Sequence, residues 1–350
     1  MTLKAPFVWF GGKRRVAAEV WTALGDVDNY VEPFAGSLAV LLGRPHDLLD
    51  GQRRAETVND ADGFLANFWR ALAHDPEAVA MWCDWPVNEV DLFARHLWLV
   101  NTGRSRLLEG MESDPDFYDA QVAGWWVWGV NAWIGSGWCS GEGPWIHGDD
   151  GIGKRPHLGT AGQGVNRQRP HLGTAGQGVN RQLPHLGNAG RAGYNNMEHR
   201  PNVLGYFEQL AGRLRDVRVC CGDWSRVVTN GALSFGSTVG VFLDPPYLGD
   251  VRTADLYAVD DHTISHEVRD WCLANGDNPR YRIVLAGYSD EHDELIPDTW
   301  KRYRYSASAA YSTTASAARQ DGNHANRKSE VLWMSPHCLT PDQGTLWETL

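Results

Sequence analysis

The sequence predicts an α/β protein in which strands and helices alternate at both ends of the chain. Short apolar runs bounded by Gly, Pro or Asp alternate with segments of helical spacing at both ends of the chain. Several of these runs end directly in an acidic residue, and the middle of the chain is poor in strands. A length of 350 residues, with 43% hydrophobic and 21% charged residues, is typical of a soluble globular protein of one large or two smaller domains.

The first α/β unit is predicted to extend to residue 62. Helical spacing covers 16–24, and a short strand follows at 30–32. A glycine-containing turn at 34–37 then leads into a predicted helix over 38–42. A second strand, 55–60, ends in an acid.

Residues 63–200 are predicted to form an inserted domain. The stretch 64–130 is helical and rich in tryptophan, and it separates the strands of the first unit from those that resume later. Within the insert, 155–196 repeats a glycine-rich unit of 14 residues. The repeats contain few residues that can fill a core, so we expect an exposed loop or an extended arm that follows phosphates. The evenly spaced histidines of the repeats are not expected to bind a metal.

The α/β pattern resumes after residue 200. The predicted elements are a helix over 203–214, strands over 217–221, 239–243 and 282–286, a helix over 266–275, and a final strand pair near 303–305 and 330–334. Residues 1–62 and 201–350 are therefore predicted to form one domain that the insert interrupts.

The charge distribution points to a phosphate-bearing partner. The net charge is −11, yet residues 151–200 and 300–330 are both strongly basic. Two basic islands in an acidic chain fit a protein that grips phosphates on one face. No apolar stretch reaches membrane-spanning length and no signal peptide opens the chain, so we expect a cytoplasmic protein. The six scattered cysteines are predicted to be free thiols, without a zinc site or disulfide framework.

The tetrapeptide Asp244, Pro245, Pro246 and Tyr247 follows the apolar run 239–243 and is the strongest candidate catalytic motif. Consecutive prolines fix the backbone and leave carbonyl groups without a ladder partner. A carboxylate and a bare carbonyl can accept the two hydrogens of a planar amino group while the tyrosine stacks on its ring. The motif therefore predicts a socket for an exocyclic amino group.

Further ligand-binding residues are predicted at the other strand ends, where open α/β sheets bind ligands. The turn from Glu32 to Gly36 allows close backbone approach, Asp60 is placed to hold ribose hydroxyls, and Asp223 and Trp224 can accept from and stack on an adenine. Near the N-terminus, the Gly-Gly-Lys at 11–13 does not match a P-loop, because the required glycine and Ser/Thr are absent. Together with a nearby aromatic residue, this Gly-Gly-Lys segment can instead line a pocket for a small charged cofactor.

These motifs, in this order, resemble the Dam-type (D12 class) DNA adenine-N6 methyltransferases. The segments that carry the resemblance are 6–13, 30–36, 59–62 and 244–247. The resemblance implies a Rossmann-like class I methyltransferase sheet, the cofactor S-adenosylmethionine, no metal, and methyl transfer to adenine N6 in double-stranded DNA with base flipping. The predicted cofactor-binding residues are Trp9, Gly12, Lys13, Glu32, Phe34, Gly36, Asp60, Asp223 and Trp224.

The insert is implied to recognise the DNA target through a hairpin around 131–141. The predicted DNA-binding residues are Asn131, Ser136, Trp138, Ser140, Arg327 and Lys328. Ser140 stands near the position of the arginine that reads guanine in GATC-specific members, so a different recognition site is expected.

Two groups of alternatives remain open at this point. The same socket serves cytosine N4, an RNA base or a glutamine amide, and a non-catalytic DNA-binding relative can keep the fold. The resemblance favours a monomer, and restriction-modification, protection of a phage genome and regulation all remain possible roles.

Overall fold

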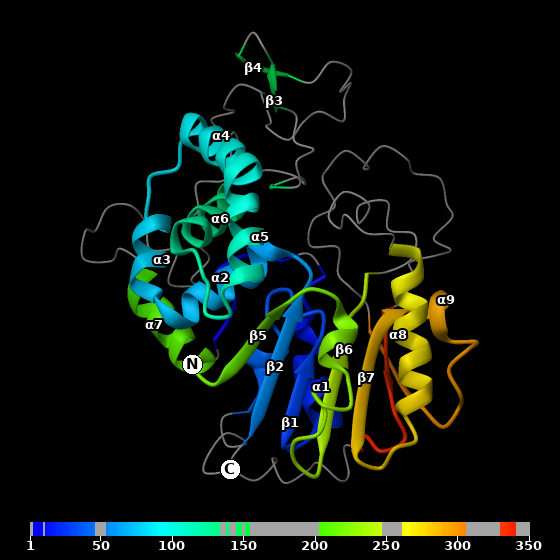
Figure 1. The fold of residues 1–350 in the computed structure, drawn as a ribbon. Coiled ribbons are helices and arrows are strands. Elements are labelled where there is room, and N and C mark those ends of the chain that lie inside the picture. Colours follow the sequence, from blue (N-terminus) through cyan, green and yellow to red (C-terminus); the bar gives the residue numbers. More distant parts are fainter. Residues whose placement is uncertain are drawn as a thin grey trace, which may run out of the picture.

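The computed structural model describes residues 3–9, 11–45, 54–133, 138–139, 145–148, 151–154, 203–246, 261–305 and 330–340. Their centre is a seven-stranded sheet with the strand order β5-β2-β1-β6-β7-β9-β8 (Figure 1). The strands are β1 (Asn29–Glu32), β2 (Ala55–Asp60), β5 (Val217–Cys221), β6 (Val239–Leu243), β7 (Tyr281–Tyr288), β8 (Lys301–Tyr305) and β9 (Glu330–Met334). From β5 to β7 every pair is parallel, and β9 runs antiparallel to both of its neighbours. The predicted α/β class, with a Rossmann-like methyltransferase sheet, is confirmed.

Both faces of the sheet are covered, because successive side chains of its strands enter different cores. Tyr30 and Phe242 lie in a cluster that also holds the apolar residues of helix α1, whereas Val31 and Val241 lie in a second cluster with residues of helix α8. All five residues of β6 are buried, as expected for a central parallel strand.

The helices largely follow the predicted ranges. They are α1 (Ala17–Leu24), α2 (Gly63–His74), α3 (Pro76–Cys83), α4 (Glu89–Trp98), α5 (Arg104–Ser113), α6 (Ala120–Ala132), α7 (Val203–Leu214), α8 (Asp261–Asn275) and α9 (Ser289–His292). Short turns of helix are η1 (Lys13–Arg15), η2 (Leu41–Gly43), η4 (Leu99–Gly103) and η7 (Trp224–Val227). Asp62, Asp75, Asn88 and Asp119 cap the N-termini of α2, α3, α4 and α6 through their side chains.

The helix predicted over 38–42 is wrong. Leu38 has a φ of 53°, in the left-handed region, and an α-helix cannot continue through that conformation. Only the 3₁₀ turn η2 forms there.

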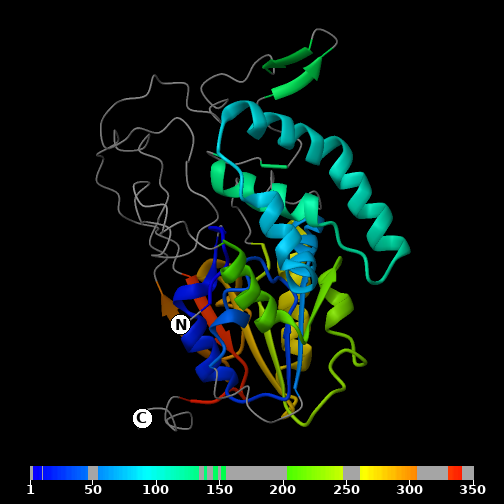
Figure 2. The same ribbon diagram turned by 90° about the vertical axis from the view of Figure 1, so that its left-hand side faces the viewer.

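The helical block α2 to α6 sits above the carboxyl edge of the sheet, and α7 packs against its first two helices (Figures 1 and 2). An aromatic cluster of Phe7, Phe68, Trp69 and Trp126 links this block to the N-terminal segment. Helix α2 also contacts strands β2 and β5. One continuous core therefore joins the helical block to the sheet, and the division into domains at residues 62 and 201 stays a prediction.

Beyond α6, the structure contains a two-stranded antiparallel hairpin, β3 (Trp145–Gly148) and β4 (Gly151–Lys154). The hairpin predicted from residue 131 does not begin there, because α6 continues through Ala132. The repeat at 155–196 lies outside the described residues.

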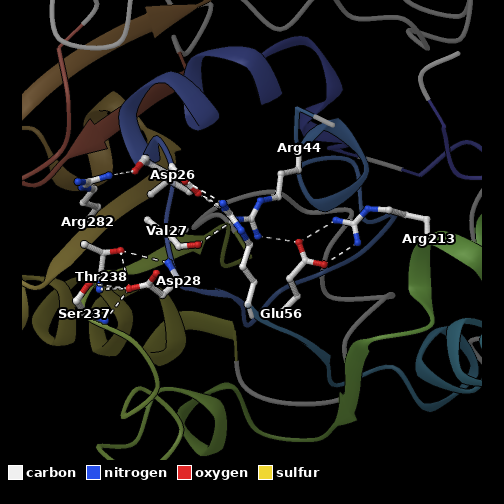
Figure 3. A network of polar contacts seen from close by, with 11 residues as sticks. Asp26, Val27, Asp28, Arg44, Glu56, Arg213, Ser237, Thr238 and Arg282 are labelled. Atoms are coloured by element: carbon white, nitrogen blue, oxygen red, sulfur yellow. Dashed lines mark hydrogen bonds and ion pairs between the residues drawn. The ribbon is translucent and has the colours of Figure 1, made fainter. Parts of the chain in front are cut away.

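A polar network closes the amino end of the sheet (Figure 3). The Glu56 carboxylate accepts from Arg44 at 2.9 Å and from two nitrogens of Arg213 at 2.6 and 2.9 Å. Arg44 also donates to the Val27 carbonyl at 2.9 Å, and Asp28 accepts from backbone N–H groups just before β6. The network ties β2 to α7 and to the loop after η2.

Within the described ranges, no helix combines the length and apolar character that a membrane crossing requires. All six cysteines are described, and none is bridged.

Candidate active site

The predicted catalytic and cofactor motifs meet at the carboxyl edge of three adjacent strands, β2, β1 and β6. Extending the observed registers beyond β1 brings Phe34 level with both Asp60 and Asp244. Neighbouring strands lie about 4.8 Å apart, so the two carboxyl-bearing residues are separated by roughly 10 Å at backbone level. Asp223 follows the next strand, β5, whose Cys221 pairs with Asp60. The strand order thus collects residues that are far apart in the sequence.

The N-terminal motif reaches the tetrapeptide directly through Lys13. The Lys13 ammonium lies 3.0 Å from Asp244 Oδ1 and donates to the Gly11 carbonyl at 2.8 Å. It also lies 4.0 Å from Glu330 Oε2, at the start of β9. Lys13 is only 6% exposed, so burial strengthens these electrostatic contacts. Sequence reasoning assigned Lys13 to the cofactor and missed both carboxylate partners.

The glycine turn after β1 is held from several sides. Gly36 has a φ of 47°, and a Cβ there would lie 2.9 Å from the Trp9 indole, so both conformation and space require glycine. The Gly36 N–H donates to Asp60 Oδ2 at 2.9 Å, and the Trp69 indole donates to the Gly36 carbonyl at 3.0 Å. Gly36 therefore joins two other predicted cofactor-binding residues, Trp9 and Asp60, and α2 adds a tryptophan that sequence reasoning did not single out.

Asn59 is a second residue that sequence reasoning missed. Its buried amide donates to the Pro33 carbonyl at 3.1 Å and to the Gly222 carbonyl at 2.9 Å. These bonds fix the turns that follow β1 and β5 against the end of β2. The signal in the sequence was a polar amide directly before the acid that ends the predicted strand 55–60.

Two carboxyl groups at this edge have strongly raised pKa values. Burial raises the pKa of Glu32 to about 8, and the nearby negative charge of Asp244 adds to this effect. The Tyr30 hydroxyl donates to Glu32 at 2.9 Å. Burial likewise raises the pKa of Asp60 to about 7, against the opposing effect of backbone N–H donors from Asp62 and Gly36. Buried acids with perturbed pKa values concentrate at functional sites.

Asp223 and Trp224 occupy different environments. Asp223 is exposed and accepts from the Ser225 backbone at 2.9 Å, which caps η7. Trp224 is 7% exposed and stacks on Phe34, with ring centroids 6.2 Å apart and an interplanar angle of 27°. The pair brings the turn after β5 against the turn after β1, and the predicted contacts of both with an adenine ring stay predictions.

Of the residues predicted to bind DNA, Asn131 and Trp138 are described. Asn131 is buried in the last turn of α6, and its amide donates to the Pro6 carbonyl at 3.1 Å and the Val127 carbonyl at 2.8 Å. Ser136, Ser140, Arg327, Lys328 and the predicted catalytic Tyr247 lie outside the described residues.

The chain around Trp138 is fastened to the helical block. The Trp138 indole packs against Gly129, where a Cβ would lie 1.7 Å from the ring, and it donates to the Trp126 carbonyl at 3.1 Å. The next residue, Cys139, has a φ of 59°, and its carbonyl accepts from Arg104 at 2.5 Å. Trp138 is thus an anchor on α6, and its predicted contact with DNA stays a prediction.

The second basic island is described only in part. Arg302 and Arg304 of β8 both pair with Asp293. Lys301 is exposed at the start of β8. Among the described side chains, no cluster of His, Cys, Asp and Glu has the arrangement of a metal site.

The chemistry of this edge agrees with a family comparison. The family model of the D12 class N6 adenine-specific DNA methyltransferases matches residues 9–84, which include the turn after β1, all of β2 and the whole of α2. The resemblance predicted from the sequence is confirmed, and the match supports DNA adenine methylation as the chemistry of the chain. A search among curated proteins finds no match.

The matched segment ends well before Asp244, so the family comparison does not itself include the tetrapeptide. Lys13 lies inside the match and makes its ion pair with Asp244 outside it. This contact joins the matched segment to the candidate catalytic motif.

Proposed function

We propose that the protein transfers a methyl group from S-adenosylmethionine to N6 of an adenine flipped out of double-stranded DNA. The observation that carries the proposal is the 3.0 Å ion pair between Lys13 and Asp244. It places a carboxylate, held by a buried cation, directly at the end of β6. Pro245 and Pro246 follow this carboxylate at once, as the socket for an amino group requires.

The residues at this edge fit S-adenosylmethionine as a cofactor. When bound, it supplies an electrophilic methyl group on a positively charged sulfur. Buried or partly buried acids line this edge, since Glu32 and Asp60 end β1 and β2 and Asp244 follows β6, and Lys13 is paired with Asp244. Asp60 and Asp223 are the proposed partners of the ribose and the adenine, and the Gly36 turn allows the close backbone approach that a nucleoside needs.

The proposed roles of the tetrapeptide follow from its donor and acceptor inventory. Asp244 and the Pro245 carbonyl accept the two N6 hydrogens of the target adenine. These bonds draw the N6 lone pair out of conjugation with the ring and orient it toward the methyl group. Positioning and electrostatic stabilisation therefore supply most of the acceleration. The N6 proton leaves to water after the methyl group has moved.

The target base is also proposed to leave the duplex. Adenine N6 is paired inside the double helix, and extruding the nucleotide costs a few kcal/mol. Stacking of the flipped base on Tyr247 offsets roughly 1–3 kcal/mol of this cost. The residues 63–200, as a target-recognition domain, and Arg327 and Lys328, as phosphate contacts, supply the remaining binding energy in this proposal.

The substitution Asp244→Ala tests the proposal. Transfer of a labelled methyl group to DNA is expected to fall by at least about 10³-fold, because the main acceptor for N6 is lost. Calorimetry is expected to show S-adenosylmethionine affinity within a few-fold of wild type. The exposed Asp277→Ala serves as the matched control and is expected to keep full activity.

Two results would overturn the proposal. Retained turnover in Asp244→Ala would remove Asp244 from the reaction. Failure of the wild-type protein to bind S-adenosylmethionine would favour the non-catalytic alternative. Methyl transfer to RNA or to cytosine instead of adenine would redirect the same chemistry to another amino group.

A further inference from the structure

Lys13 lies between two carboxylates that come from different strands of the sheet. Asp244 follows β6 and Glu330 opens β9, and the strand β7 separates them. β6 and β9 are therefore two strand spacings, roughly 10 Å, apart at backbone level. The Lys13 ammonium bridges this gap, at 3.0 Å from Asp244 and 4.0 Å from Glu330.

Glu330 occupies this position because of the register of β9. It pairs with Tyr288 of β7 and Tyr305 of β8, the last residues of both strands. The antiparallel direction of β9 thus brings the first residue of the strand to the edge where its neighbours end. A carboxylate that is 8% exposed reaches the candidate active site as a result.

Burying a carboxylate without a cation is costly, so its position calls for an explanation. Among the described residues, Lys13 is the cation to which Glu330 is paired. The 4.0 Å separation exceeds a hydrogen bond, so Glu330 acts on Lys13 through its charge.

We infer that Glu330 is a positioning residue that holds Lys13 in place beside Asp244. This inference rests on the proposed function. When the target amino group approaches Asp244, it competes with Lys13 for the carboxylate oxygens, and Glu330 retains the ammonium nearby.

A double-mutant cycle between Glu330 and Lys13 tests the inference. Glu330→Gln keeps the size of the side chain and removes its charge. It is expected to lower kcat about 10-fold, with the KM values for DNA and S-adenosylmethionine nearly unchanged, because the loss acts only in the transition state. In a Lys13→Met background, the same substitution is expected to change kcat less than about twofold, because the ammonium through which Glu330 acts is gone.

Conservative and control variants separate this role from a general structural one. Glu330→Asp keeps the charge and is expected to restore most of the activity that Glu330→Gln loses. The exposed Glu294→Gln is the matched control and is expected to behave as wild type. Urea unfolding of the wild type, Glu330→Gln, Lys13→Met and the double variant gives a measurement that does not depend on turnover. The effects of the two substitutions on the unfolding free energy are expected to be non-additive.

The outcomes distinguish this inference from the proposed function. Additive effects of Glu330→Gln and Lys13→Met on kcat, or an unchanged kcat in Glu330→Gln, would overturn the role of Glu330 in an enzyme that is otherwise active. If the wild-type protein methylates no DNA, the proposed function fails and the positioning role fails with it, whatever the unfolding coupling shows. Should Glu330→Gln not fold, the cycle between Glu330→Ala and Lys13→Met gives the same comparison, because alanine also removes the charge.

Discussion

At the amino end of the sheet two guanidinium groups enclose Glu56, whereas at the carboxyl end a single ammonium serves Asp244 and Glu330. In the first cluster, Glu56 accepts from both guanidinium groups at hydrogen-bonding distances of 2.6–2.9 Å. The second has more carboxyl groups than cations, and Glu32 nearby has a strongly raised pKa. Both clusters are largely buried, so burial alone does not distinguish structure from function. The carboxyl end is marked instead by buried acids with strongly raised pKa values, Glu32 and Asp60, and such acids concentrate at functional sites.

Removing the cation of the carboxyl end is expected to have the largest effect. Lys13→Met removes the partner of Asp244, so the carboxylate loses its fixed position. We expect kcat to fall by about 10²- to 10³-fold. Single-turnover methyl transfer measures the change, and the exposed Arg215→Met is the control. Full activity in Lys13→Met would mean that the ion pair has no catalytic role.

Removing the acid of the amino end is expected to affect stability and leave catalysis unchanged. Glu56→Ala strands the buried guanidinium groups of Arg44 and Arg213, which typically costs about 3–5 kcal/mol of unfolding free energy. Urea unfolding measures this loss, with the exposed Glu208→Ala of α7 as the control. The kcat per folded molecule is expected to stay at the wild-type value. A large fall in kcat at full stability would contradict the division between the two ends.

The pH dependence of stability is expected to report on the carboxyl end. Burial raises the pKa of Glu32 from an ordinary 4.5 to about 8 and that of Asp60 from 3.8 to about 7. The folded chain therefore keeps protons that the unfolded chain has released. The contribution of these two acids to the unfolding free energy is fully present below their ordinary pKa values. It is lost as pH rises through their raised pKa values, by up to about 1.4 kcal/mol per pH unit for each group.

Glu32→Gln replaces one of these acids with a side chain that does not titrate. Between pH 5 and 8, the unfolding free energy of this variant is expected to fall less steeply than that of wild type. Urea titrations at each pH measure the two slopes of unfolding free energy against pH. Glu208→Gln, which removes an exposed carboxyl group, is the control and is expected to keep the wild-type slope. Parallel curves for wild type and Glu32→Gln would show that Glu32 is ionised in the folded chain.

Two glycine substitutions away from both charge clusters measure how a purely steric change alters the stability of the protein. Gly129→Ala in α6 sets a Cβ 1.7 Å from the Trp138 ring, so the ring must move, at a typical cost of about 1–3 kcal/mol. Gly212→Ala in α7 meets no atom within 4 Å and is expected to stabilise its helix by about 0.5–1 kcal/mol. Equal melting temperatures for both variants would contradict the packing of Trp138 on α6.

The sequence predicted most of the sheet because its strands are short apolar runs with clear ends, as in 239–243. It also predicted which strand ends carry acids, since Asp60 ends its strand and Asp244 follows its strand directly. It could not predict that Lys13 reaches Asp244, because that contact joins residues 231 positions apart through a fold in which β6 lies beside β1. The helix over 38–42 was wrong because apolar periodicity does not reveal a left-handed residue such as Leu38.

The contribution of Glu330 was equally hidden, because it depends on β9 running opposite to its neighbours. A strand pattern gives no direction, so an acid at the start of a strand looks remote from acids at the ends of others. The Asn59 amide and the Trp69 indole were overlooked for a related reason. Each supports the site through backbone carbonyls of another segment, and such contacts leave no motif in a single sequence.

The central claim is that Asp244, held by Lys13, directs methyl transfer to adenine. Mass analysis of nucleosides from DNA methylated with labelled S-adenosylmethionine tests it most directly, using wild type and Asp244→Ala in parallel. We predict labelled N6-methyladenine with the wild-type protein and none with the variant. Labelled N6-methyladenine at equal levels from both proteins would contradict the account.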